Sequence, residues 1–155
     1  MLGKVLVKAE GSGRARLPGA FSPHFADSLL IRECVDGSDG CVVSRDPDGN
    51  PPPGVTPYLR LYPKTAETRI LDQLGIFESI EDSECAWDAR ELSDMFREVN
   101  LDADHRFTLP AETRSHLGLA EGQECRLIFL GMGDCVEVWR PEDYETAKRN
   151  YFNRA

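Results

Sequence analysis

Two stretches of the chain share the pattern that decides its fold: residues 10–18 read EGSGRARLP, and residues 102–110 read DADHRFTLP. In both, an acidic residue is followed four positions later by arginine, and seven and eight positions later by leucine and proline. The two copies are offset by 92 residues, for example 106 − 14 for the arginines. A unit that occurs twice at a constant spacing predicts a chain built from two similar halves.

The residues around the two copies repeat as well. Apolar residues alternate before each copy, which indicates a strand; they are Val5, Val7 and Ala9 in the first half, and Val99 and Leu101 in the second. A short helix is predicted after each copy, starting at Pro18 and at Pro110. Further strands are expected at residues 29–34, 41–45, 125–130 and 135–139. One half is too small to bury a good core, so we expect the two halves to close one barrel together.

The residues between the repeated parts show two other patterns. Residues 64–74 and 86–99 have helical spacing, and each predicts one apolar helix face; these faces hold Ile70, Leu71 and Leu74, and Leu92, Met95, Phe96 and Val99. Residues 36–40 predict a turn, and residues 46–57 predict a polar, proline-rich surface loop with an extended stretch.

Composition indicates one compact unit, with 41% hydrophobic and 29% charged residues in 155. No apolar run approaches the ~20 residues of a membrane span, and the N-terminal residues read as a strand rather than a signal peptide. The five cysteines have no metal-binding spacing, and their odd number indicates a reducing cytoplasm; they are Cys34, Cys41, Cys85, Cys125 and Cys135.

The net charge of −9 is unusual for a protein that binds nucleic acid. Residues 72–104 hold eleven acids and two bases, which accounts for the whole net charge. Residues 1–20 hold four bases and only one acid. Because charges more than ~8 Å apart are largely screened at physiological salt, this local basic edge can act despite the distant acidic region.

The first repeated phrase predicts a basic β-surface. Gly11 and Gly13 allow a sharp turn and a close approach, and Arg14 leaves that turn on the next strand. Lys8 and Arg16 lie an even number of residues from Arg14, so on strands these three side chains would point to the same kind of face. Such a set of cations suits a groove of nucleic acid. An alternative is that Glu10 and Arg14 form a purely structural salt bridge across the turn.

The second phrase predicts a weaker contact, because Asp102 and Asp104 surround Arg106 with negative charge. Asp102, Asp104 and His105 could also be interpreted as a metal or acid–base cluster, but a solvated turn is the more ordinary interpretation. The sequence contains no G-x-S-x-G, P-loop or H-E-x-x-H motif, so we expect no enzyme, no metal and no cofactor.

The doubled phrase resembles the MraZ family, within the AbrB/MazE-like proteins, whose members carry D-x-K-G-R-x-x-(I/V/L)-P in each half. Residues 57–63 and 136–142, each followed by a helical stretch, resemble the ends of the two halves in that family. The resemblance covers roughly residues 3–145. This chain departs from the pattern in having Glu10 for aspartate, Ser12 for lysine, and His105 for a glycine that would tolerate positive φ.

The resemblance implies a mostly-β protein with flanking helices, a pseudo-two-fold swapped-hairpin barrel. Residues 3–63 and 97–145 would be two AbrB-like repeats, and residues 64–96 linker helices with an acidic segment, all within one compact unit.

It also implies a cytoplasmic, nucleoid-associated regulator of bacterial division and cell-wall genes. Its partners would be double-stranded DNA and its own copies in a ring, with no membrane and no small-molecule substrate. The alternative is a protein-interaction or antitoxin-like module that kept the barrel but lost its affinity for DNA.

Two sets of residues follow from the phrase and the resemblance. The expected DNA contacts are Lys8, Ser12, Gly13, Arg14, Arg16 and, more weakly, Arg106. The expected structural positions of the turns are Glu10, Gly11, Pro18, Asp102 and Pro110.

Overall fold

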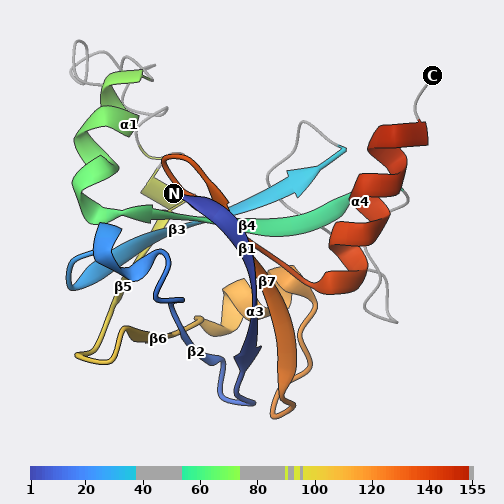
Figure 1. The fold of residues 1–155 in the computed structure, drawn as a ribbon, viewed down its shortest axis with the longest axis horizontal. Coiled ribbons are helices and arrows are strands. Elements are labelled where there is room, and N and C mark those ends of the chain that lie inside the picture. Colours follow the sequence, from blue (N-terminus) through green and yellow to red (C-terminus); the bar gives the residue numbers. More distant parts are fainter. Residues whose placement is uncertain (38–53, 74–89, 91–92, 95, 154–155) are drawn as a thin grey trace.

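The computed structural model describes residues 1–37, 54–73, 90, 93–94 and 96–153 (Figure 1). The predicted mostly-β fold with flanking helices is confirmed. The strands are β1 (Leu2–Ala9), β2 (Arg14–Arg16), β3 (Ser28–Asp36), β4 (Thr56–Pro63), β5 (Phe96–Asn100), β6 (Arg106–Thr108), β7 (Cys125–Met132) and β8 (Val136–Trp139). The helices are η1 (Ser22–His24), η2 (Lys64–Ala66), α1 (Glu67–Gln73), α3 (Ala111–Leu117) and α4 (Pro141–Asn153).

Six of the strands form one antiparallel sheet in the order β1-β7-β8-β4-β3-β5, and β2 and β6 form a separate two-stranded ribbon. Figure 1 shows α1 and α4 at opposite ends of the molecule, with the strands crossing between them. The two edge strands of the sheet, β1 and β5, do not pair with each other, so the sheet is not closed by hydrogen bonds within the described residues. The predicted closed barrel is therefore not confirmed.

Four of the pairings between described strands join the two halves of the chain. β1 from the first half pairs with β7 from the second, and β5 from the second half pairs with β3 from the first. β2 pairs with β6 around Ala15 and Phe107, which are 92 residues apart and so occupy the same place in the two phrases. A fourth pairing joins β4 to β8, with Arg60 opposite Glu137 at its centre.

The main hydrophobic core also draws on both halves. Leu17, Phe21 and Leu61 from the first half pack in one buried cluster with Phe107 and Phe129 from the second. Each of these side chains is at most 2% exposed. Since interior side chains pack at crystal-like density, this shared cluster fixes how the two phrases lie against each other.

Three predictions of local structure need correction. No helix starts at Pro18: the 3₁₀ turn η1 begins only at Ser22, after the Pro18 carbonyl has accepted the N–H groups of Phe21 and Ser22. The helix predicted over residues 86–99 gives way to strand β5 at Phe96, because residues 96–100 pair with β3. The proline-rich loop predicted over residues 46–57 ends earlier, since β4 begins at Thr56.

Other local predictions are confirmed or fall outside the described residues. The helix predicted over residues 64–74 is present as η2 and α1, up to Gln73. Pro110 immediately precedes α3, as predicted. The strand at residues 41–45, most of the turn at 36–40, most of the loop at 46–57 and much of the acidic segment lie outside the described residues.

Candidate nucleic-acid interface

The two repeated phrases form turns with the same backbone geometry. In the first, the N–H of Glu10 donates to the carbonyl of Arg14 (2.8 Å), and that of Gly13 donates to the carbonyl of Glu10 (2.8 Å). In the second, Asp102 and His105 make the equivalent bonds at 3.0 Å each. Gly13 has φ 87° and His105 φ 61°, so both turns use the left-handed region. This confirms that His105 occupies a position that favours glycine.

The two turns differ in how their acidic residue is used. The Asp102 carboxylate accepts hydrogen bonds from the backbone N–H groups of Asp104 (2.8 Å) and Arg106 (2.9 Å). The Arg106 N–H, with the Asp104 N–H and the Arg14 guanidinium, holds the pKa of Asp102 below its ordinary value. Glu10 makes no side-chain hydrogen bond within the described part of the chain. The second turn is therefore the more strongly braced of the two.

Arg14 pairs with Asp102, not with Glu10. Its Nη2 lies 2.7 Å from Asp102 Oδ2, and the two side chains are 45% and 38% exposed. The alternative interpretation, a Glu10–Arg14 salt bridge, is therefore wrong: the acid that orients Arg14 comes from the other copy of the phrase. The two phrases form one composite site through this bond.

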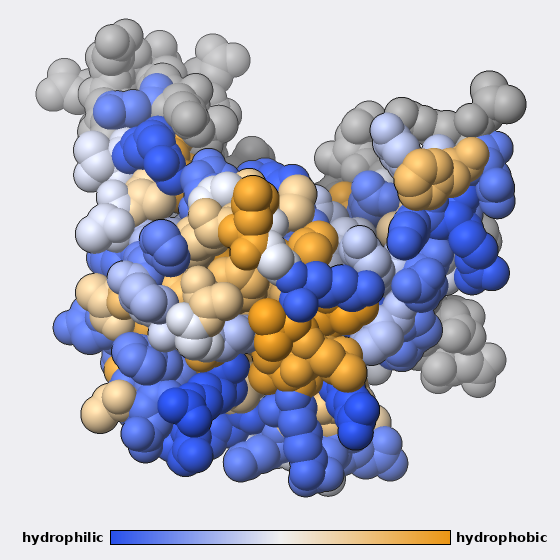
Figure 2. Space-filling model, viewed as in Figure 1, coloured by the Kyte–Doolittle hydropathy of each residue, from blue (hydrophilic) through white to orange (hydrophobic). Residues whose placement is uncertain are grey.

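The β2–β6 ribbon presents arginines on its outer face. Ala15 and Phe107 are buried, whereas Arg14, Arg16 and Arg106 are exposed, as strand alternation requires. Arg16 and Arg106 are register partners across the ribbon, and like charges directly opposite each other repel. We call Arg14, Arg16 and Arg106 the basic ribbon. Figure 2 shows hydrophilic side chains over the end of the molecule that holds β2 and β6.

A second pair of cations lies on β1 and β7. Lys8 is exposed, is the register partner of exposed Arg126, and forms an ion pair with Glu124 at 3.2 Å. Sequence reasoning missed Arg126. Its alternation with buried Leu127 could have shown that it is exposed, but its place opposite Lys8 depends on strand register between the two halves.

The glycines of the first turn approach the chain's own second half. A side chain at Gly11 would place its Cβ 2.6 Å from the backbone of Gly122, and one at Gly13 would come within 2.7 Å of the Arg114 side chain. The predicted close approach is thus an internal contact. It leaves Ser12 exposed at the tip of the turn.

Helix α3 anchors the second phrase to the sheet. Thr113 is fully buried and donates to Glu33 Oε1 on β3 at 3.2 Å. His116 Nε2 lies 2.8 Å from the carbonyl oxygen of Cys34. The helix ends at Gly118, whose φ of 73° allows a left-handed cap. These contacts hold the segment that follows β6 in a fixed position.

The described residues contain no group of three histidine, cysteine, aspartate or glutamate side chains placed to hold a metal ion. Among the described helices, none is long and apolar enough to cross a membrane.

The fold and this composite site define a mostly-β protein in which two similar turns, from distant parts of the chain, are joined by an acid–arginine pair. A family model described as "MraZ protein, putative antitoxin-like" matches residues 96–154. A transcriptional regulator MraZ of Dehalococcoides mccartyi is 30% identical over 112 residues, covering 63% of this chain and 76% of that relative. A transcriptional regulator MraZ of Rhodococcus opacus is 26% identical over 145 residues, which cover 94% of this chain and 84% of that relative. This chain belongs to the MraZ family.

Proposed function

We propose that this chain is a DNA-binding transcriptional regulator that acts on bacterial division and cell-wall genes. The observation that carries the proposal is the basic ribbon, in which Arg16 faces Arg106 and Arg14 is fixed beside them by Asp102. A phosphate backbone would relieve the repulsion between the two opposed arginines. The name of the relatives, transcriptional regulator MraZ, supports the same function. Such a protein would act in the cytoplasm, at the nucleoid.

The proposed architecture is a pseudo-two-fold barrel of two AbrB-like repeats, residues 3–63 and 97–145, joined by a linker at residues 64–96. The strand pairings support it, because equivalent positions meet at the centre of the β2–β6 ribbon. Two backbone hydrogen bonds between equivalent positions of the two phrases support it too. Leu17 N–H donates to the His105 carbonyl (2.8 Å), and Leu109 N–H donates to the Gly13 carbonyl (2.9 Å).

In this proposal Arg14 serves structure and binding together. Its guanidinium has five N–H donors, and the bond to Asp102 involves Nη2 alone, so other donors can reach a phosphate or a guanine edge. Arg16 and Arg106 add charge on the same face. Ser12, exposed at the tip of the turn, would lie nearest the DNA, with Lys8 at its margin. Gly13 was expected to contact DNA too, but it is buried, and its N–H and carbonyl are bonded to Glu10 and Leu109.

A homo-oligomeric ring would compensate for the modest charge of one site. The whole chain carries −9, and Lys8 and Arg14 already have acidic partners. Several weak contacts on repeated DNA boxes would add through their effective concentration. These same ion pairs favour the second candidate function, a protein-interaction or antitoxin-like module without affinity for DNA.

Fluorescence anisotropy with DNA from upstream of the chain's own gene cluster tests the proposal, with a scrambled duplex as the control and a salt series for both. We expect tighter binding to the upstream DNA and a logarithmic affinity that falls linearly with the logarithm of salt concentration. Equal, weak binding to both duplexes at low salt would reject DNA regulation and favour the interaction module.

A further inference from the structure

A cavity of about 310 Å³ lies beside the basic ribbon. It is bounded by β1, by the chain between β2 and η1, and by the turn that precedes β6. Its apolar wall includes Val5, Val7 and Leu17, and its polar residues are Arg16, Ser22 and His105. A cavity of about 150 Å³ suffices for a benzene ring, so this one has room for a small organic molecule.

His105 gives this cavity a polar atom without a partner. Its ring Nδ1 is buried and has no hydrogen-bond partner among the described residues. Its backbone is already bonded, because its N–H donates to the Asp102 carbonyl (3.0 Å) and its carbonyl accepts from the Leu17 N–H (2.8 Å). Buried polar atoms in native proteins nearly always have a partner. The imidazole therefore points to a group that the described chain does not itself supply.

The equivalent space in the first half is filled by the chain itself. Gly13 stands 92 residues before His105, and Ser22 stands 92 residues before Arg114. A Cβ at Gly13 would lie 2.7 Å from the Arg114 side chain, so that arginine packs against the first turn. At the second turn the equivalent of Arg114 is the small Ser22, and both Ser22 and His105 line the cavity. The replacement of arginine by serine thus leaves room beside the second phrase.

The charge beside the cavity favours an anion. Arg16 is exposed, forms no ion pair with the described residues, and has Arg106 as its register partner. Of the two acids on the neighbouring turn, Asp102 is paired with Arg14 at 2.7 Å and Asp104 is exposed to water. A free guanidinium binds carboxylates through short, charge-assisted hydrogen bonds.

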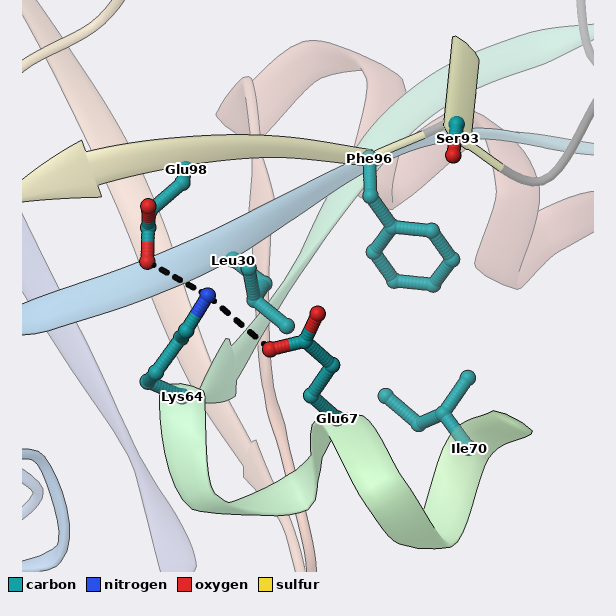
Figure 3. A pocket seen from close by; sticks show the side chains of 7 residues that line it. All are labelled: Leu30, Lys64, Glu67, Ile70, Ser93, Phe96 and Glu98. Atoms are coloured by element: carbon teal, nitrogen blue, oxygen red, sulfur yellow. Dashed lines mark ion pairs between the residues drawn. The ribbon is translucent and has the colours of Figure 1, made fainter. Parts of the chain in front are cut away.

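A second cavity, of about 210 Å³, lies between β3, β5, η2 and α1 and has Phe96 in its wall (Figure 3). Its polar groups already satisfy one another. Lys64 Nζ lies 2.9 Å from Glu67 and 2.7 Å from Glu98, so one cation is shared between two carboxylates. The cavity beside the ribbon differs in having a cation and an imidazole that lack partners among the described residues.

We propose that the cavity beside the ribbon binds a small organic acid, with its carboxylate held by Arg16 and His105 and its apolar body against β1. A carboxylate accepts hydrogen bonds both from the guanidinium and from a protonated ring nitrogen. Leu6, which is 54% exposed, and the half-buried Val5 and Val7 supply the apolar contact. Figure 2 shows apolar side chains where β1 crosses this face, beside the hydrophilic end that holds β2 and β6.

The acid also regulates DNA binding, in a part of the inference that rests on the proposed function. Arg16 belongs to the basic ribbon and lines the cavity. A carboxylate bound to Arg16 removes that cation from the DNA-binding face, so the acid and DNA compete.

Isothermal titration calorimetry of the full chain, without DNA, tests the site with benzoate as the probe. Benzamide has the same shape without the charge, and acetate has the charge without the ring. Benzoate should bind at least about 10-fold more tightly than either, because apolar burial and charge-assisted hydrogen bonds both contribute. No binding of benzoate at millimolar concentration, or equal affinity for benzoate and benzamide, would overturn the proposal.

Two variants test the residues. His105→Gly removes the imidazole and suits the φ of 61° at this position, so the turn is retained. Arg16→Gln removes the charge. Each should weaken benzoate binding by at least about 10-fold. Arg69→Gln removes an exposed arginine on α1 that does not line the cavity, and this matched control should bind like wild type. Wild-type affinity in His105→Gly, or an equal loss in Arg69→Gln, would contradict the site, with urea unfolding showing that all three variants fold.

DNA binding separates this inference from the proposed function. Benzoate binding that responds to these variants as expected supports the site even if the chain fails to bind its upstream DNA. Failure of benzoate to bind overturns the site however tightly that DNA binds. Where both bind, saturating benzoate should weaken DNA binding, and DNA should weaken benzoate binding by the same factor. An unchanged DNA affinity would overturn the competition at Arg16.

Discussion

Glu137 provides the sharpest test of how the two halves are joined. It is 6% exposed on β8, opposite Arg60 at the centre of the β4–β8 pairing. Its Oε2 accepts from Arg60 Nε at 3.3 Å, and its Oε1 accepts from Trp139 Nε1 at 3.0 Å. Tyr58 stacks on Trp139 with ring centroids 4.4 Å apart. We predict that Glu137→Ala destabilises the fold strongly and that Glu137→Gln does so less.

The magnitude follows from the two partners that Glu137 satisfies. An indole N–H left buried without an acceptor costs about 1–3 kcal/mol. Breaking a fully buried ion pair costs about 3–5 kcal/mol. The Arg60 side chain is 36% exposed, so water compensates part of its loss. We therefore expect Glu137→Ala to lower the free energy of unfolding by about 2–4 kcal/mol. Glu137→Gln retains an acceptor for the indole and should cost about 1 kcal/mol less.

Urea unfolding followed by tryptophan fluorescence measures these changes, with all proteins at the same concentration because assembly affects apparent stability. A loss of 2–4 kcal/mol corresponds to a fall in melting temperature of roughly 5–15 °C for a chain of this size. A change below about 0.5 kcal/mol for Glu137→Ala, typical of a surface substitution, would refute the reasoning that this network joins the halves.

Three further predictions concern the turns and the acidic segment. Gly11→Ala should lose about 1–3 kcal/mol in urea unfolding because its Cβ would lie 2.6 Å from backbone, whereas Gly19→Ala, with nothing within 4 Å, should be nearly neutral; equal effects would contradict the packing of the turn. The backbone hydrogen bonds of its turn keep the pKa of Asp102 below 3.8, so its stabilising effect is present above that pH and lost as pH falls through the folded-state pKa. The melting temperatures of wild type and Asp102→Asn should accordingly converge below about pH 4, and a constant difference would argue against the brace. Neutralising the three acids within residues 81–84 should change DNA affinity less than Arg14→Ala, and the opposite ranking in anisotropy titrations would place the acidic segment at the ligand.

Much of the fold could be predicted because the decisive signals are local. Spacing within the phrase fixes a turn that needs positive φ at its fourth position, and His105 adopts φ 61° there, as Gly13 adopts 87°. Alternation also identified which arginines of the ribbon are exposed, since Ala15 and Phe107 are buried between them. These properties depend on a few neighbouring residues and need no knowledge of tertiary structure.

The errors arose where distant parts of the chain meet. Arg14 pairs with Asp102, which is 88 residues away, whereas the only acidic partner that the sequence suggested for it, as an alternative, was the nearer Glu10. Phe96 and Val99 fit a helical spacing, but pairing with β3 places both in a strand. Tertiary pairing overrides local propensity in such a segment. The cavity beside Phe96 was missed for the same reason, because its walls come from four separate elements.

The salt dependence of DNA binding by Arg14→Ala tests the central claim most directly. Affinity for the upstream duplex is measured by anisotropy between about 50 and 200 mM salt for wild type, Arg14→Ala and Arg106→Ala. If Arg14 contacts phosphate, its loss should weaken binding and reduce the slope of log affinity against log salt by about 0.9 per contact and engaged subunit. If it contacts a guanine edge, the loss should be about 1–3 kcal/mol and concentrated at one base position. In either case Arg106→Ala should weaken DNA binding less than Arg14→Ala does. Unchanged affinity and slope for Arg14→Ala, with a melting temperature lowered as much as by Arg106→Ala, would show that the Arg14–Asp102 pair is a structural brace and would contradict the DNA-binding account.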